Sequence, residues 1–243
     1  MSEIKEREPS PSVLAKRAEK KEKYVSAARE LIGQHGLAEA SVHGLARKLG
    51  LSPAALYWYF PSREALIGEV QRRVFAELAQ EFHAHGAKLV AACKQHDSDP
   101  ATASLTVLLG LAHYYLGMPE RNPEQARVIG FSLDPRVWLD AEEGALFAPV
   151  LVNLFREVAI PFQQAADAGA LQPGPANTRA VQFWAALQGL IQAGKLGRLA
   201  PTLFESYTLG MNSAETLLVG WGAQREAVMR ARSLWSELTL ALR

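Results

Sequence analysis

The chain has 243 residues, 49% of them hydrophobic, and a formal net charge of +1. A chain of this length forms one large or two modest domains, and this apolar fraction is enough for a sizeable core. No uninterrupted apolar run reaches the roughly 18 residues expected of a membrane span. The polar start MSEIKEREPSPS is unlike a secretory signal, and the one cysteine, Cys93, cannot form an internal disulfide. We therefore expect a cytoplasmic protein without a membrane partner.

The small net charge hides an asymmetry along the chain. Residues 1–75 carry 13 Lys/Arg and 9 Asp/Glu, a balance of +4, whereas residues 76–243 carry 13 and 16, a balance of −3. A basic first third suits a DNA-binding head on a body that binds something else. A chance excess of this size is the alternative, so the charge alone does not decide between them.

The predicted elements are helices almost throughout. Residues 1–15 hold prolines and several charges, and we expect them to form a disordered tail. From Lys16 onward the apolar residues recur at helical spacing, and Gly36 is a suitable end for that helix.

Serine residues mark the starts of the next three helices. Ser41 precedes a short amphipathic helix that ends at Gly50, and Ser52 precedes a second one, with Pro53 at its first position. Ser62 then begins a long helix through residue 82. Beyond residue 100 the chain alternates apolar helical stretches with Pro and Gly and shows no strand pattern. Helices are expected near residues 101–118, 122–134, 142–169, 176–199, 203–221 and 224–242.

The segment SVHGLARKLGLSPAALYWYF, residues 41–60, is typical of a helix-turn-helix. Ala46 is small where the two helices approach, and Gly50 permits the positive φ that the turn between them needs. In this motif the second helix lies in the major groove of DNA and the first crosses the backbone. The sequence therefore predicts DNA binding.

The side chains around the second helix suit different parts of a DNA duplex. The two alanines let the helix backbone approach the groove, the tyrosines can donate to phosphate oxygens, and Trp58 can pack on base edges. The run Lys16–Lys23 is basic and suits phosphates or the minor groove, although its glutamates leave a solvated helical face as the alternative. The expected DNA-binding residues are Ser41, Arg47, Ser52, Ala54, Ala55, Tyr57, Trp58, Tyr59, Arg63 and Lys20.

This region resembles the TetR family of transcription regulators. The resemblance covers residues 16–75 and rests on the helix from Tyr24, the break at Gly36-Leu37, and the stretch LARKLGLSPAALYWYFPSREAL. It implies an all-α fold, a homodimer that binds a palindromic double-stranded DNA operator, and a small-molecule effector that relieves repression. Carried across, the family's DNA contacts fall on Ser41, Ser52, Ala55, Tyr57, Tyr59 and Arg63. Three of these, Ser41, Tyr59 and Arg63, stand where Thr, His and Lys are commoner.

The resemblance also divides the chain. A tail at residues 1–15 would precede a helix-turn-helix domain at 16–64, and a helical domain for effector binding and dimerisation would occupy 65–243. Such a protein would be associated with the bacterial nucleoid.

Aromatic residues with a few polar tips gather in residues 105–190, and sites for small molecules are mostly apolar with few polar groups. We expect an apolar or aromatic effector there, with plain core packing as the alternative for any one residue. The expected ligand-binding residues are His113, Tyr114, Phe131, Trp184 and Gln188.

A late apolar stripe is the expected dimer interface, because Gly210 and Ala214 within it allow close helix packing. Burial in the chain's own core is the alternative. The expected interface residues are Tyr207, Met211, Ala214, Leu217 and Leu218.

Nothing in the sequence forms a catalytic set or a Gly-rich phosphate loop. Cys93, His96 and Asp97 have a spacing that metal ligands can use, but a structural thiol at a helix end is the better interpretation. We therefore expect no enzyme activity, no metal and no cofactor. The alternatives are an enzyme positioned on DNA, such as a recombinase, and a nucleoid protein without an effector.

Overall fold

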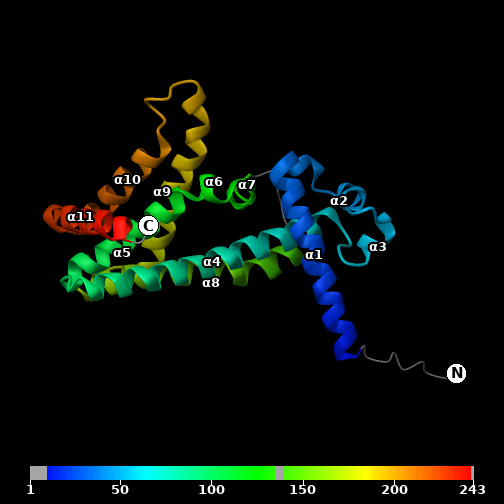
Figure 1. The fold of residues 1–243 in the computed structure, drawn as a ribbon, viewed down its shortest axis with the longest axis horizontal. Coiled ribbons are helices and arrows are strands. Elements are labelled where there is room, and N and C mark those ends of the chain that lie inside the picture. Colours follow the sequence, from blue (N-terminus) through cyan, green and yellow to red (C-terminus); the bar gives the residue numbers. More distant parts are fainter. Residues whose placement is uncertain (1–9, 135–139, 242–243) are drawn as a thin grey trace.

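The computed structural model describes residues 10–134 and 140–241, and every regular element within them is helical (Figure 1). This confirms the predicted all-α fold. The tail expected at residues 1–15 falls partly outside the described residues, but residues 11–15 are helical. Pro11 explains this start, because proline is favoured in the first turn of a helix, where its missing N–H is not needed.

The N-terminal head consists of α1 (Pro11–His35), the 3₁₀ turn η1 (Leu37–Glu39), α2 (Val42–Leu49) and α3 (Pro53–Tyr57). Its core is small and fully closed, since Leu45 and Leu56 are 0% exposed and Phe60 is 1% exposed. Burying a side chain of this kind contributes about 1.5–3 kcal/mol. A handful of such residues therefore holds the short helices α2 and α3 against α1.

A long helix joins the head to the rest of the chain. α4 (Arg63–Gln95) begins at the cap Ser62, whose Oγ accepts from the backbone N–H of Ala65 at 2.9 Å, and extends from the head into the body (Figure 1). The helix α8 (Ala141–Asp167) lies along it in the same direction, tied by Arg72 to Glu143 at 2.5 Å.

The body is completed by shorter helices: α5 (Pro100–Leu116), α6 (Met118–Arg121), α7 (Pro123–Phe131), α9 (Ala176–Ala193), η2 (Gly194–Arg198), α10 (Ser206–Gly220) and α11 (Arg225–Ala241). α5 is central and packs against α4, α8, α9, α10 and α11. The predicted helices all exist, but the one expected over 176–199 changes to 3₁₀ geometry at Gly194. The one-turn α6 was not predicted.

By length and composition, α8 qualifies as a membrane-spanning helix, and no other helix of the described residues does. One such helix is weak evidence for a span, because a core helix of a soluble protein passes the same test. Here Leu154 and Phe162, 1% exposed each, anchor α8 in the helical body.

Candidate nucleic-acid interface and internal cavity

The turn between α2 and α3 has the geometry that the sequence predicts. Gly50 adopts a left-handed conformation, with φ 65° and ψ 31°, which side chains other than glycine rarely take. Ser41 Oγ accepts from the N–H of Gly44 at 3.0 Å, and Ser52 Oγ accepts from the N–H of Ala55 at 3.4 Å. The two caps and the glycine thus set where α3 begins and which way it points.

The outer face of α3 is open. Ala54 and Ala55 are exposed, and Tyr57 and Trp58 are 43% and 56% exposed although both are large aromatic residues. Exposed aromatic side chains that the chain does not cover are candidates for binding a partner. Leu56, between Ala55 and Tyr57 in the sequence, is buried in the core of the head. The helix α3 therefore presents one face to solvent and the other to the head.

His43 and Arg47 of α2 are exposed, and His43 borders this face. Arg47 was expected from the sequence to contact DNA, whereas His43 was not. The Nε2 atom of His43 lies 3.4 Å from the Tyr57 hydroxyl, so the imidazole and the phenol form one polar edge. In the sequence, the position of His43 in the first turn after the Ser41 cap is the feature that could have indicated this role.

Trp58 and Tyr59 are both held by α1. The guanidinium of Arg17 lies 3.2 Å from the centre of the Trp58 ring, a cation–π contact, and Tyr59 meets Tyr24 edge-on at 5.0 Å. Tyr59 is half-buried as a result. Base contact by Trp58 and phosphate contact by Tyr59 stay predictions, and each residue also has this packing role.

Arg63 also has an internal role. Its Nε donates to the carbonyl of Ala40 at 2.8 Å and its Nη2 to the carbonyl of Leu37 at 2.9 Å. These bonds clamp the connection between α1 and α2, while the residue remains exposed. A DNA contact from Arg63 stays a prediction.

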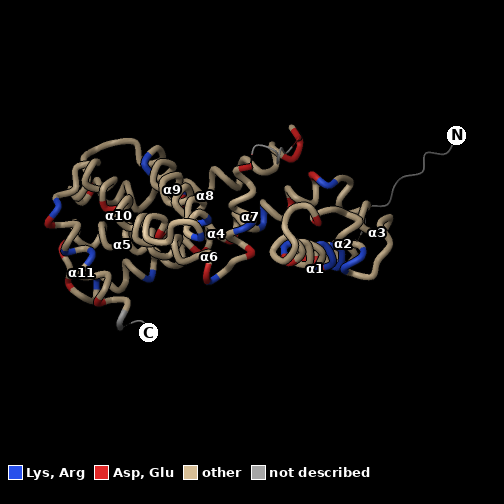
Figure 2. The backbone as a smooth tube through the Cα atoms, turned by 90° about the horizontal axis from the view of Figure 1, so that it is seen from above, with Lys and Arg blue, Asp and Glu red and all other residues tan. Residues whose placement is uncertain are grey.

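The lysines of α1 divide between two faces. Lys21 pairs with Glu69 of α4 at 2.9 Å. Lys16, Lys20 and Lys23 are exposed and share another face, because positions i, i+4 and i+7 of a helix lie on one side. In Figure 2 the basic stretches of α1 lie on the side of α2 and α3. The exposed lysines therefore extend the basic surface of the head.

Burial would raise the pKa of Glu69. Hydrogen bonds from Arg72 and Lys21 outweigh that effect and lower the pKa below its ordinary value. The ion pair between Lys21 of α1 and Glu69 of α4 is thus kept.

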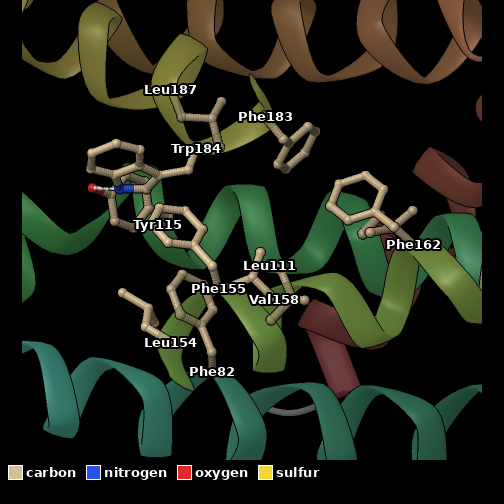
Figure 3. Close-up of a pocket in the computed structure, with 11 residues that line it drawn as sticks. Phe82, Leu111, Tyr115, Leu154, Phe155, Val158, Phe162, Phe183, Trp184 and Leu187 are labelled. Carbon is tan, nitrogen blue, oxygen red and sulfur yellow. Dashed lines mark hydrogen bonds between the residues drawn. The ribbon is translucent and has the colours of Figure 1, made fainter. Parts of the chain in front are cut away.

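A small apolar cavity of about 20 Å³ lies in the body between α4, α5, α8 and α9, where Figure 3 shows aromatic rings converging from several helices. This space holds about one water molecule, so a larger guest needs the lining to move. The lining residues are Phe82, Leu108, Leu111, Tyr115, Leu154, Phe155, Val158, Phe162, Phe183, Trp184 and Leu187.

The lining has one polar corner. Trp184 Nε1 donates to the Tyr115 hydroxyl at 2.8 Å, and that hydroxyl donates to Gln188 Oε1 at 2.6 Å. Burial raises the pKa of Tyr115 well above its ordinary value, which keeps the phenol neutral. The Nε2 of Gln188 is buried without a hydrogen-bond partner, and such a group is costly to leave unsatisfied.

The five ligand-binding residues expected from the sequence do not meet at one site. Trp184 lines the cavity and Gln188 lies at its polar corner. His113 instead bonds Tyr207 through Nδ1 at 2.5 Å, and Tyr114 donates to Glu81 at 3.2 Å.

Phe131 lines a separate open cleft near the end of α1. Tyr115, the neighbour of His113 and Tyr114, is the α5 aromatic residue that faces the cavity. Successive residues of a helix point about 100° apart, so the sequence alone did not show which of the three faces inward.

The expected dimer residues also separate. Ala214 and Leu218 are 0% exposed within this chain, so as placed here they serve its own core. Tyr207 is 42% exposed, and Met211 and Leu217 are half-buried.

Cys93 is buried, with Sγ 3.9 Å from the carbonyl oxygen of Ala103, and burial raises the pKa of its thiol. Across residues 10–134 and 140–241 no group of three or more His, Cys, Asp or Glu is placed to hold a metal ion.

Comparison with known proteins agrees with this architecture. Residues 25–70 match the family described as "Bacterial regulatory proteins, tetR family". No curated protein sequence matches the chain.

Solved structures share the fold at low sequence identity. SmeT, the repressor of the Stenotrophomonas maltophilia multidrug efflux pump SmeDEF, is 15% identical, with a TM-score of 0.58 over 85% of this chain and 92% of that one. A TetR-family transcriptional regulator from Pectobacterium atrosepticum is 16% identical, with a TM-score of 0.61 over 85% and 96%. RolR, solved with resorcinol, is 18% identical, with a TM-score of 0.58 over 90% and 95%.

The matched segment spans the end of α1, the whole helix-turn-helix and the start of α4, and the structural likeness extends over the body. The family and these relatives are transcription regulators, not enzymes. Residues 25–70 therefore carry the N-terminal, DNA-binding domain of TetR-family regulators, and the body has the helical fold of the solved TetR-family structures.

Proposed function

We propose that the protein is a cytoplasmic repressor that binds a palindromic operator as a homodimer and leaves it when a small, largely apolar effector binds in the body. The observation that carries the proposal is the open face of α3. Tyr57 and Trp58 are exposed there on a helix whose start and direction are fixed by the Ser52 cap and Gly50.

A palindromic operator needs two recognition helices about 34–36 Å apart, and one chain supplies one. The exposed apolar residues of the body support a second copy. Five large ones lie between residues 181 and 207, at the α9 and α10 end of the body: Val181, Leu196, Leu199, Leu203 and Tyr207. We infer that this surface, together with Met211 and Leu217, meets its counterpart in the dimer.

Light scattering tests the dimer. The double variant Leu199→Glu, Leu203→Glu is expected to be monomeric with an unchanged helical circular dichroism spectrum. The reason is that Leu199 is 83% exposed and Leu203 64% exposed in the single chain. A dimer that persists in this variant would exclude these residues from the interface.

Support for an effector comes from the cavity and its polar corner. A guest that opens the cavity can bury apolar surface against Phe155 and Phe162 and can accept a hydrogen bond from the free Nε2 of Gln188. Binding that favours one arrangement of the body shifts the population of that arrangement, and operator affinity falls if the two heads are then wrongly spaced.

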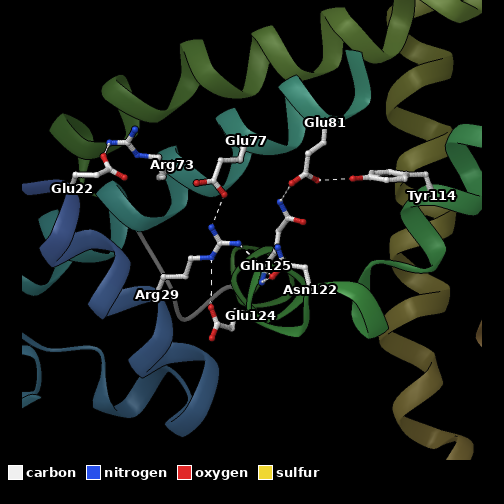
Figure 4. A network of polar contacts seen from close by, with 9 residues as sticks. All are labelled: Glu22, Arg29, Arg73, Glu77, Glu81, Tyr114, Asn122, Glu124 and Gln125. Carbon is white, nitrogen blue, oxygen red and sulfur yellow. Dashed lines mark hydrogen bonds and ion pairs between the residues drawn. The ribbon is translucent and has the colours of Figure 1, made fainter. Parts of the chain in front are cut away.

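Side-chain hydrogen bonds, and not only the chain itself, connect the body to the head. Arg29 of α1 donates to Glu77 of α4 at 2.5 Å and to Asn122 at the start of α7 at 3.4 Å (Figure 4). Glu81 of α4 accepts from Gln125 of α7 at 3.3 Å and from Tyr114 of α5 at 3.2 Å. A displacement of α5 or α7 on effector binding therefore reaches α1.

Gel shift of the full-length protein on its own upstream DNA tests the DNA-binding part. Tight, sequence-dependent binding at physiological salt, lost in Tyr57→Ala, is the expected result. Equal, weak binding to that DNA and to a scrambled control, with a steep salt dependence, would instead favour a nucleoid protein.

A further inference from the structure

An open groove lies on the surface directly outside the internal cavity. It runs between α4 and α8 above α5 and has a volume of about 370 Å³. Phe82 and Leu111 line both spaces. The groove residues are Phe82, His83, Gly86, Ala87, Val90, Ala91, Lys94, Val107, Leu111, Glu157, Ile160, Pro161 and Gln164.

The boundary between groove and cavity is formed by side chains. Phe82 is 8% exposed and its ring stacks on Tyr115 at 6.0 Å, with Leu111 beside it at 5% exposed. Because Phe82 lines both spaces, a change of its rotamer would open one to the other.

α8 has a local weakness at the same place. Pro161 lies inside the helix and has no N–H to donate to the carbonyl of Glu157. Its neighbour Phe162 lines the cavity, and Pro161 itself lines the groove. Helices bend at interior prolines, so α8 can yield where a guest would pass.

The groove is apolar along its length and polar at its ends. Gly86 and Ala87 on α4 leave the space open, and Ile160 on α8 is 43% exposed to it. At one end His83 Nδ1 and Glu157 Oε2 already satisfy each other at 3.0 Å.

Hydrogen-bond donors dominate the other end. Lys94 carries an ammonium group and Gln164 an amide, and neither side chain has a hydrogen bond or ion pair within the described residues. Such donors suit an anionic head group.

We propose that the effector is an elongated amphipathic carboxylate, whose apolar tail passes Phe82 into the cavity while its carboxylate meets Lys94 and Gln164. This inference rests on the proposed effector site and names its ligand class. Phe82 and Lys94 are 12 positions apart on α4, which at 1.5 Å per residue is about 18 Å. The ligand therefore has a long tail rather than a compact ring system.

Calorimetry on the full-length protein with alkyl carboxylates of two lengths tests the ligand class. Dodecanoate is expected to bind at least about tenfold more tightly than octanoate, since each buried methylene is worth up to about fourfold in affinity. Dodecanol and dodecylammonium of the same length are expected to bind more weakly than dodecanoate. Equal affinities for the two carboxylates, or tighter binding of the ammonium, would overturn the proposal.

Two variants locate the binding. Gly86→Leu fills the groove at a position where an added Cβ meets nothing within 4 Å, and Gly144→Leu is its control on α8 with equally free space. Gly86→Leu is expected to weaken dodecanoate by about tenfold, equivalent to the loss of about two buried methylenes, and Gly144→Leu to leave it unchanged. Lys94→Gln is expected to weaken dodecanoate but not dodecanol. Wild-type affinity in Gly86→Leu would refute a tail in the groove.

Naphthalene, followed by its own fluorescence, separates this inference from the proposed function. It is compact and apolar and tests the cavity alone, so its equilibrium affinity is expected to be the same in wild type and Gly86→Leu. If naphthalene binds while the carboxylates show no length dependence, the elongated ligand is wrong and the effector cavity stands. If neither naphthalene nor any carboxylate binds, both are wrong.

Discussion

Two arginines join the same pair of helices and differ in burial, which gives a matched test of the link between head and body. Arg29 of α1 pairs with Glu77 of α4, and its side chain is 18% exposed. Arg73 of α4 pairs with Glu22 of α1, and these side chains are 42% and 48% exposed. Figure 4 shows both pairs. Arg29 also reaches Glu124 of α7 at 3.9 Å.

Replacing Arg29 by Met removes charge-assisted hydrogen bonds that are partly shielded from water. A hydrogen bond to a charged group contributes about 1.5–3 kcal/mol, and an exposed ion pair about 0–1 kcal/mol. We therefore expect Arg29→Met to lower the free energy of unfolding by about 2–3 kcal/mol and Arg73→Met by less than about 1 kcal/mol. For a chain of this size 1 kcal/mol shifts Tm by about 2–4 °C. Arg29→Met should thus melt about 4–12 °C lower.

Thermal unfolding by circular dichroism or calorimetry, on both variants in the same buffer, measures this difference. The loss of stability in Arg29→Met should also change little with added salt, whereas any loss of stability in Arg73→Met should become smaller. Equal Tm values for the two variants would refute the argument that burial of the Arg29 network holds α1 to α4 and α7.

The head and one partly buried histidine, His85, allow further tests. Leu56→Ala should cost about 2–5 kcal/mol of stability and Tyr57→Ala less than about 0.5, by denaturant unfolding; similar losses would contradict the assignment of Leu56 to the core. Gly50→Ala should destabilise by about 1–2 kcal/mol and Gly50→Asn by less, since Asn tolerates the left-handed conformation; the reverse order would dispute the turn. Burial, with Arg121 and His113 nearby, lowers the pKa of His85 to about 4. Because this pKa lies below the unfolded value of 6.5, the unfolded state binds a proton first, and the free energy of unfolding should fall as the pH drops from about 6.5 towards 4. An NMR titration midpoint near 6.5 would argue against the partial burial of His85.

Sequence reasoning predicted the helices well where the signals are local. Ser41, Ser52 and Ser62 each cap the helix that they precede, and Gly50 adopts the expected positive φ. Caps and turns depend on a few neighbouring residues, so they can be read from a single chain.

The sequence was less informative about contacts between residues that are far apart in the chain. It did not show that Tyr115 rather than His113 or Tyr114 faces the cavity, because that depends on how α5 is rotated among the helices that pack against it. It also did not show that Arg17 covers Trp58. Arg17 and Trp58 are 41 positions apart in the chain, so their contact follows from packing and not from spacing.

The stripe proposed for the dimer shows the same limit. Apolar spacing along α10 identifies a buried face but not what buries it, and Ala214 and Leu218 lie in the chain's own core. Leu203 belongs to that stripe, whereas Leu199 lies outside it, directly after the 3₁₀ turn η2, so periodicity gave no signal for Leu199.

We propose that two copies of the α2–α3 head read a specific DNA sequence. Selection of bound sites from random-sequence DNA by the full-length protein, at physiological salt, tests this proposal. We expect an enriched palindrome with half-sites about one helical turn apart, bound roughly 10³-fold or more tightly than scrambled DNA, and loss of that preference in Tyr57→Ala. Recovery of no enriched sequence, with wild type and Tyr57→Ala binding DNA alike, would contradict it.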